Sequence, residues 1–153
     1  MKHLLIVYHS QSGTNARLAQ AVLEGARQES AVETRLQRAC DATTLDLLWA
    51  DAVVFGSAEN FGYLSGGLTD FLARTFYPYL QHAPSRPLPY AVFVGTGNDG
   101  RGAVRQLQRI VGGYPMKSIA EPVFVRGEIE EGDLQRCAEL GLSVAAGLAM
   151  GIF

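Results

Sequence analysis

The chain has 153 residues, and its 13 Lys and Arg against 15 Asp and Glu give a formal net charge of −2 at pH 7. This length fits one domain, residues 1–153, with a core of its own. The cations are scattered, so no basic field attracts nucleic acid or anionic lipid, and we expect neither as a partner. The longest apolar run near the N-terminus, Leu4 to Tyr8, is too short for a signal peptide or a membrane span, which predicts a cytoplasmic protein.

Short apolar runs alternate with segments whose apolar residues recur at helical spacing. The runs predict strands at residues 4–8, 31–36, 52–56, 90–95 and 123–125. The second run alternates apolar and polar residues, as an edge strand does, and the last could begin near Ser118. Helical spacing predicts helices at residues 18–26, 44–49, 64–76, 103–111 and 133–150. The third helix is expected to end before Pro78, because proline interrupts helical hydrogen bonding.

Strict alternation of strands and helices predicts a doubly wound α/β domain. Its five strands would form a parallel sheet with right-handed crossovers and helices on both faces. In such sheets ligands bind outside the carboxyl ends of the strands, where the winding direction reverses. Three loops of unusual composition leave predicted strand ends, at residues 10–15, 57–63 and 96–102. We therefore expect these loops to converge on one crevice.

The first of these loops has the composition of a phosphate site. Ser10, Ser12 and Thr14 offer hydroxyl groups, Asn15 offers an amide, and Gly13 permits close approach of a ligand to the backbone. A helix follows at once, and the N–H groups of its first turn, with the helix dipole, favour an anion. The alternative is that the hydroxyls only cap this helix.

On these loops the sequence resembles the flavodoxin-like family, which includes flavodoxins and small FMN-dependent NAD(P)H:quinone or FMN reductases. The resemblance covers essentially the whole chain and rests on residues 8–15, 56–66 with 69–72, and 95–98. The middle segment is similar to that of the reductase branch, although Ala58 stands where the family often has proline. The resemblance implies a flavodoxin-like five-stranded sheet of order 2-1-3-4-5, with one FMN at the carboxyl ends of the first, third and fourth strands.

FMN would place its phosphate on the first loop, where neutral donors would hold it and Arg17 is the only nearby cation. Its ring needs an aromatic face and polar groups at its edge. Phe61 and Tyr63 could supply the face, unless they are ordinary packing residues, and backbone groups of the second and third loops could supply the edge. The predicted FMN-binding residues are Ser10, Gln11, Ser12, Gly13, Thr14, Asn15, Ser57, Ala58, Glu59, Asn60, Phe61, Gly62, Tyr63, Thr96, Gly97, Asn98 and Asp99. If Glu59 and Asp99 face the ring, their charges would lower the flavin potential.

The third loop also satisfies a dinucleotide-binding fingerprint. Gly95-x-Gly97-x-x-Gly100 follows a strand and opens a helix, and Glu121 lies about twenty residues further on. That fingerprint belongs to the first strand–helix turn of a dinucleotide-binding domain, whereas here it follows the fourth strand. We interpret these glycines instead as allowing the loop to lie close to a flavin ring.

The sequence gives little support for a disulfide, a metal site or a catalytic histidine. Cys40 and Cys137 form no C-x-x-C pair, which predicts two buried or partly buried thiols without a disulfide or a metal site. No metal-ligand spacing appears. His9 is expected to be a packing residue, and His82 a solvated residue in a proline-rich loop near the crevice.

The resemblance implies an FMN-dependent oxidoreductase that passes electrons from NAD(P)H to a quinone or a similar small acceptor. The flavin would carry the chemistry, so no side chain is named as catalytic. One alternative is a flavodoxin-type carrier of single electrons between protein partners. Another is a flavin-free domain of the same fold that binds a protein partner. The apolar segment from Phe76 to Leu80 is a candidate contact in a homo-oligomer.

Overall fold

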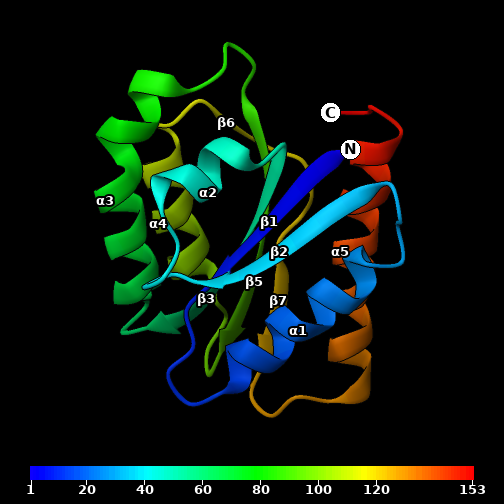
Figure 1. Cartoon of the computed structure of the whole chain (residues 1–153). Helices are drawn as coiled ribbons and strands as arrows, with labels where there is room; N and C mark the ends of the chain where they lie inside the picture. Colours follow the sequence, from blue (N-terminus) through cyan, green and yellow to red (C-terminus); the bar gives the residue numbers. More distant parts are fainter.

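A parallel sheet runs through the centre of the computed structural model, which describes residues 1–153 (Figure 1). Its strands pair in the order β2-β1-β3-β5-β6, with β7 also beside β5 and β4 antiparallel to β3. The bounds are β1 Lys2–Tyr8, β2 Val32–Arg38, β3 Ala52–Asn60, β4 Tyr63–Leu64, β5 Leu88–Thr96, β6 Met116–Ser118 and β7 Val123–Arg126. The predicted order 2-1-3-4-5 is confirmed, with β5 as the fourth strand and β6 and β7 together as the fifth.

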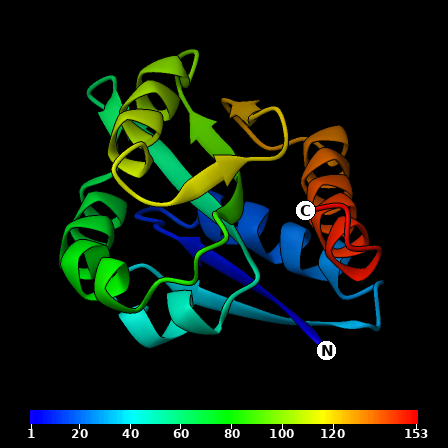
Figure 2. The same ribbon diagram turned by 90° about the horizontal axis from the view of Figure 1, so that it is seen from above.

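Helices cover both faces of this sheet, as expected for a doubly wound domain (Figure 2). On one face lie α1 (Thr14–Ala26) and α5 (Glu131–Ala149). On the other lie α2 (Thr44–Trp49), α3 (Gly66–His82) and α4 (Arg101–Val111). None of these helices combines the length and the apolar composition that a membrane crossing requires.

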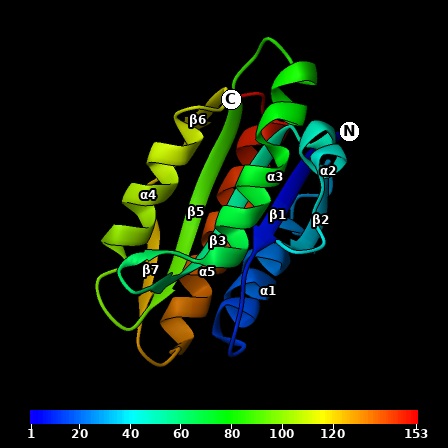
Figure 3. The same cartoon turned by 90° about the vertical axis from the view of Figure 1, so that its left-hand side faces the viewer.

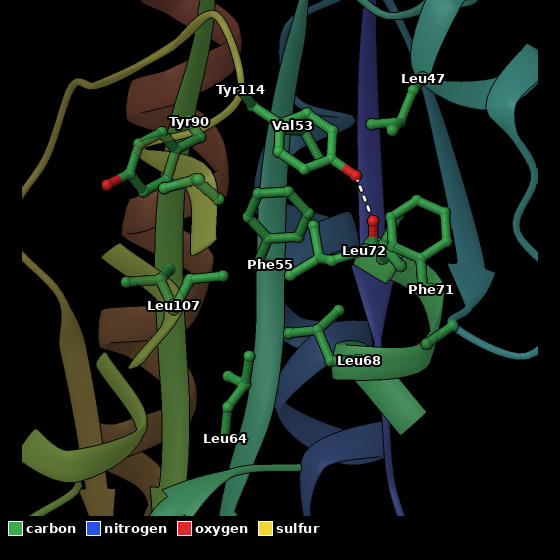
Figure 4. Close-up of a cluster of buried hydrophobic side chains, with 14 of the residues drawn as sticks. Leu47, Val53, Phe55, Leu64, Leu68, Phe71, Leu72, Tyr90, Leu107 and Tyr114 are labelled. Carbon is green, nitrogen blue, oxygen red and sulfur yellow. Dashed lines mark hydrogen bonds between the residues drawn. The ribbon is translucent and has the colours of Figure 1, made fainter. Parts of the chain in front are cut away.

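Each strand contributes to two cores because successive side chains point to opposite faces. Leu4 and Ile6 of β1 pack toward α1 and α5 in a cluster of 19 buried residues. Leu5 and Val7 pack toward α2, α3 and α4 in a cluster of 21, part of which Figure 4 shows. Because both faces of the sheet are covered, its central strands are continuous apolar runs, which is why they could be predicted from the sequence.

Helix α3 does not end before Pro78, as we expected, but continues to His82. Pro78 has no N–H to donate to the carbonyl of Arg74, one turn earlier. Both residues lie on the exposed side of the helix, so water can satisfy that carbonyl. The buried side is reinforced by side chains. The Thr75 hydroxyl donates to the Phe71 carbonyl at 2.8 Å, and the Tyr114 hydroxyl, from the loop after α4, donates to the Leu72 carbonyl (Figure 4).

The segment expected to be an exit loop, residues 57–63, is largely a hairpin. Strand β3 continues to Asn60, which pairs with Tyr63 of β4. The two residues between them, Phe61 and Gly62, have φ angles of 54° and 76°. Positive φ at both central positions is what a type I′ hairpin turn requires. In Figure 3 this hairpin extends past the end of β5 toward α4.

Helix α2 offers a direct test of the core, because Leu47 is fully buried whereas Leu45 is 76% exposed. We expect Leu47→Ala to lower the free energy of unfolding by about 2–5 kcal/mol, since it leaves a cavity. The matched control Leu45→Ala should change it by less than about 0.5 kcal/mol. Urea denaturation measures both values, and equal losses would contradict the packing of α2.

Candidate functional site at the carboxyl ends of the strands

The three predicted loops meet because of the strand register. Tyr8 of β1 lies beside Gly56 of β3, and Ala58, two residues further along β3, lies beside Gly95 of β5. All three strands are parallel, so their carboxyl ends share one edge of the sheet. A cleft of about 260 Å³ opens there, lined by Ser12, Thr14, Asn15, Ala58, Glu59, Asn60, Gly95, Thr96, Gly97 and Gly127. The expected convergence of the loops is therefore confirmed.

Helix α1 begins at this cleft without a cap. Gly13 occupies the N-cap position with a φ of 101°, and no side chain accepts a hydrogen bond from the first turn. The Ser10 hydroxyl instead accepts the Gly13 N–H at 3.1 Å and shapes the loop. The first-turn N–H groups of Thr14 and Asn15 have no partner among the backbone hydrogen bonds. Simple capping by the loop hydroxyls is thus not what the structure shows, and the first turn keeps free donors for an anion.

Asn15 joins the first loop to the third. Its side chain is only 4% exposed, and its Oδ1 accepts the N–H of Gly95 at 3.1 Å. A Cβ atom at Gly95 would lie 2.7 Å from that oxygen, so the contact requires glycine at this position. The Asn15 carboxamide oxygen therefore holds the end of β5, whereas the backbone N–H of Asn15 remains among the free donors.

Glu59 joins the second loop to the third. Its Oε1 accepts a hydrogen bond from the Thr96 hydroxyl at 3.2 Å, and its Oε2 accepts the N–H of Gly102 at 3.1 Å. Gly102 lies in the first turn of α4, where the helix dipole favours a carboxylate. The carboxylate also lines the cleft, which contains no Lys or Arg.

The aromatic residues predicted for the ring lie at the hairpin tip, beside the cleft rather than in its lining. Phe61 is 98% exposed and Tyr63 is 60% exposed. Neither side chain packs into the core, so the alternative of ordinary packing residues is wrong. Asn60, which precedes them in the hairpin, does line the cleft.

Several predicted residues lie outside the cleft lining. Ser57 is fully buried, and its hydroxyl donates to the Ala58 carbonyl and accepts the Ser65 N–H, so it stabilises the hairpin. Asp99 is exposed and accepts the Arg101 N–H at 3.0 Å. The others outside the lining are Ser10, Gln11, Gly13, Phe61, Gly62, Tyr63 and Asn98.

Sequence reasoning missed two residues that line the cleft, Gly95 and Gly127. Gly127 follows β7 with a φ of 72°, and its N–H donates to the Thr96 carbonyl. Its position just after the last predicted strand could have placed it at the cleft, because the carboxyl ends of all parallel strands lie at the same edge of the sheet.

The glycines of the apparent dinucleotide fingerprint have structural reasons of their own. Gly95 makes room for Asn15, and Gly100 is the N-cap of α4 with a φ of 75°. Gly97 is exposed at the cleft, with no atom within 4 Å of an added Cβ. Glu121 lies in a separate hollow beside α4, so it cannot serve the cleft as the acidic partner that this fingerprint needs.

The remaining reactive side chains do not gather into a second site. The His9 ring packs where a Cβ of Gly67 would be, as expected for a packing residue. His82 ends α3, far along that helix from the cleft, and not in a loop near it. No group of three or more His, Cys, Asp or Glu residues is placed to hold a metal ion.

The two cysteines differ in environment. Both are free; Cys137 is buried, whereas Cys40 is exposed, so the expectation of buried or partly buried thiols is wrong for Cys40. Cys40 lies in the turn after β2, the edge strand of the sheet, and its side chain is exposed there. Burial raises the pKa of the Cys137 thiol to about 11, which keeps it protonated and unreactive at neutral pH.

A larger hollow of about 490 Å³ lies between α1 and α5. It is lined by Arg17 and by charged and amide side chains of both helices, and it contains no strand-end residue. Arg17 therefore faces this hollow and is not part of the cleft lining. Ligand sites in doubly wound folds lie at strand ends, which favours the smaller cleft as the functional site.

The Asn15–Gly95 hydrogen bond predicts a specific loss of stability. Asn15→Ala would leave the buried Gly95 N–H without a partner, which costs about 1–3 kcal/mol. Ser12→Ala is the control, because Ser12 is exposed in the same loop. Urea denaturation without ligand should show the loss for Asn15→Ala only. A loss no larger than that of Ser12→Ala would mean that Asn15 does not hold β5.

Comparison with known proteins agrees with this fold. No family model matches the chain. The chain is 37% identical to "Flavodoxin" of Aquifex aeolicus over 46% of this chain and 38% of that protein. It is 30% identical to "NAD(P)H dehydrogenase (quinone)" of Acidithiobacillus ferrooxidans over 49% of this chain and 48% of that protein. The chain thus matches less than half the length of these curated relatives.

A solved structure extends the likeness to the whole fold. It is a flavodoxin from the domain Archaea, which superposes with a TM-score of 0.80 at 21% identity. The match covers 95% of this chain and 98% of that one. At this identity the likeness establishes the fold alone, and the sequence matches to flavodoxin and to the quinone dehydrogenase agree with it. The chain therefore has the flavodoxin-like fold.

Proposed function

We propose that the chain binds FMN in the strand-end cleft and passes reducing equivalents from NAD(P)H through FMN to a quinone or a similar small acceptor. The observation that carries this proposal is the uncapped start of α1 at a cleft formed by three strand-end loops. Free backbone donors at a helix start fit a phosphate. The flavodoxin and quinone dehydrogenase relatives support FMN as the group that brings it.

The phosphate of FMN would be held by neutral donors. Ser12 and Thr14, which carry hydroxyls, line the cleft beside the free N–H groups of the first turn of α1. Because no Lys or Arg lines the cleft, the attraction comes from hydrogen bonds and the helix dipole.

The ring of FMN would lie between the second and third loops. Exposed aromatic side chains at the hairpin tip, Phe61 and Tyr63, could cover one of its faces. Backbone groups of Asn60 and Gly97 lie at the cleft and could bond its polar edge. The flavin supplies the redox chemistry when bound, and the protein supplies its position and its electrostatic surroundings. The Glu59 carboxylate would disfavour added negative charge there, whereas Asp99 lies outside the cleft lining.

A comparison of FMN with riboflavin, which lacks the phosphate, tests this proposal. We expect the wild type to bind FMN at least tenfold more tightly, because only FMN uses the donors of the first loop. In Ser12→Ala/Thr14→Ala that preference should shrink, while riboflavin affinity stays nearly constant. Quenching of flavin fluorescence measures both affinities. Absence of binding by the wild type would refute the proposal and leave a flavin-free, partner-binding domain as the better account.

The flavodoxin match favours a second candidate function, a carrier of single electrons between proteins. Carriers of this kind dock through charged surfaces, and a net charge of −2 offers only a weak one. The two functions differ in a simple assay. An oxidoreductase should oxidise NADPH or NADH much faster than free FMN does at the same concentration. A carrier should not, and its reductive titration should resolve two one-electron steps.

The candidate contact between copies of the chain remains a proposal. Tyr77 and Leu80 on the outer side of α3 are exposed, whereas Tyr79 is buried in the core. The exposed pair could pack against a second copy.

A further inference from the structure

We propose that Glu59 and Gln106 clamp the β3–β4 hairpin to the start of α4, and that this clamp sets the aromatic side of the cleft before a ligand binds. The clamp is a property of the protein alone. Its consequence for flavin binding rests on the function proposed above.

Two side chains make the clamp. Glu59 at the end of β3 accepts the N–H of Gly102 through one carboxylate oxygen and the hydroxyl of Thr96 through the other. Gln106, one turn further along α4, accepts the N–H of Leu64 in β4 through its Oε1 at 2.9 Å. Both strands of the hairpin are thus tied to the same helix. The Glu59 bonds are strengthened by its charge and by the helix dipole.

Direct packing of the backbone completes the contact. A Cβ atom at Gly102 would lie 1.9 Å from the carbonyl oxygen of Gly62 in the hairpin turn. The helix can approach the turn this closely only because Gly102 has no side chain. Any larger residue must push the hairpin away from α4.

The hairpin needs such support because it has little of its own. Strand β4 has two residues, and a short two-stranded hairpin is marginally stable at best. Phe61 adopts a φ of 54°, a left-handed conformation that is unfavourable for a residue other than glycine. Its exposed ring buries no apolar area in return. The Ser57 hydroxyl stabilises the base of the hairpin, and the contacts with α4 hold its tip in this conformation.

A preset hairpin matters because ordering a loop during binding lowers affinity. Because the clamp holds the hairpin in place, Phe61 and Tyr63 are already positioned when the ring of a flavin binds. Glu59 is then a positioning residue. If Glu59 acted through its charge alone, removing the carboxylate should raise the affinity for the anionic FMN. A positioning role predicts that the affinity falls.

Two variants separate the clamp from the charge. Glu59→Gln removes the charge and one hydrogen-bond acceptor, because the amide oxygen can accept from the Gly102 N–H or the Thr96 hydroxyl but the amide nitrogen can accept from neither. Gly102→Ala leaves every charge in place and displaces the hairpin sterically. Glu121→Gln is the control, since Glu121 is an exposed carboxylate beside α4 and outside the cleft.

Amide hydrogen exchange of the flavin-free protein tests the clamp itself. We expect residues 59–64 and the first turn of α4 to exchange at least tenfold faster in Glu59→Gln and Gly102→Ala than in the wild type and the control. Exchange in β1 and β5 should not change, which shows that the variants are folded. Unchanged exchange of the hairpin in both variants would overturn the clamp.

Flavin binding tests the consequence. Both variants should bind FMN and riboflavin about tenfold more weakly, because the ring side of the site is affected and the phosphate loop is not. The visible circular dichroism of bound FMN, which reports the surroundings of the ring, should change in both. Tighter FMN binding by Glu59→Gln with no effect of Gly102→Ala would overturn the positioning role. If the wild type binds neither flavin, the proposed function and this consequence both fail, whereas hydrogen exchange still decides the clamp.

Discussion

The parallel register of β1, β3 and β5 is the constraint on which the rest of the site depends. Pairing of Tyr8 with Gly56, and of Ala58 with Gly95, places three strand ends at one edge of the sheet. The residues that line the cleft come from loops that are far apart in sequence, yet each loop starts within a few residues of this edge. Burial on both faces of the sheet holds the register, because a slip of one residue would turn every apolar side chain to the wrong core.

Polar contacts between the loops then convert a shared edge into a defined cleft. Asn15 ties the first loop to β5, and Glu59 ties the second loop to the start of α4. Donors at the start of α1 remain unpaired at the cleft, and the aromatic rings at the hairpin tip remain exposed beside it. An uncapped helix and a strained, exposed Phe61 both cost stability, and such costs are typical of functional sites.

Local patterns predicted most of the fold, and contacts distant in sequence explain the errors. Buried strands appear as apolar runs, so the sheet could be predicted. Helix α3 passes Pro78 because the proline faces water and Tyr114 supports the inner side, which no local pattern reveals. The β3–β4 hairpin was missed because Phe61-Gly62 lacks the usual Asn-Gly or Asp-Gly turn signal. For the cleft, three loops were predicted, and Gly127 was missed although it follows a predicted strand; the burial of Ser57, in contrast, depends on tertiary packing.

The central claim is that FMN binds with its phosphate at the start of α1. Titration of the ¹⁵N-labelled protein with FMN, followed by two-dimensional NMR, tests it most directly. We predict that the largest shifts occur at the backbone N–H groups of residues 12–16, with further shifts at residues 58–61, 95–97 and 127. Shifts confined to the hollow between α1 and α5, or no shifts with excess FMN, would contradict the account.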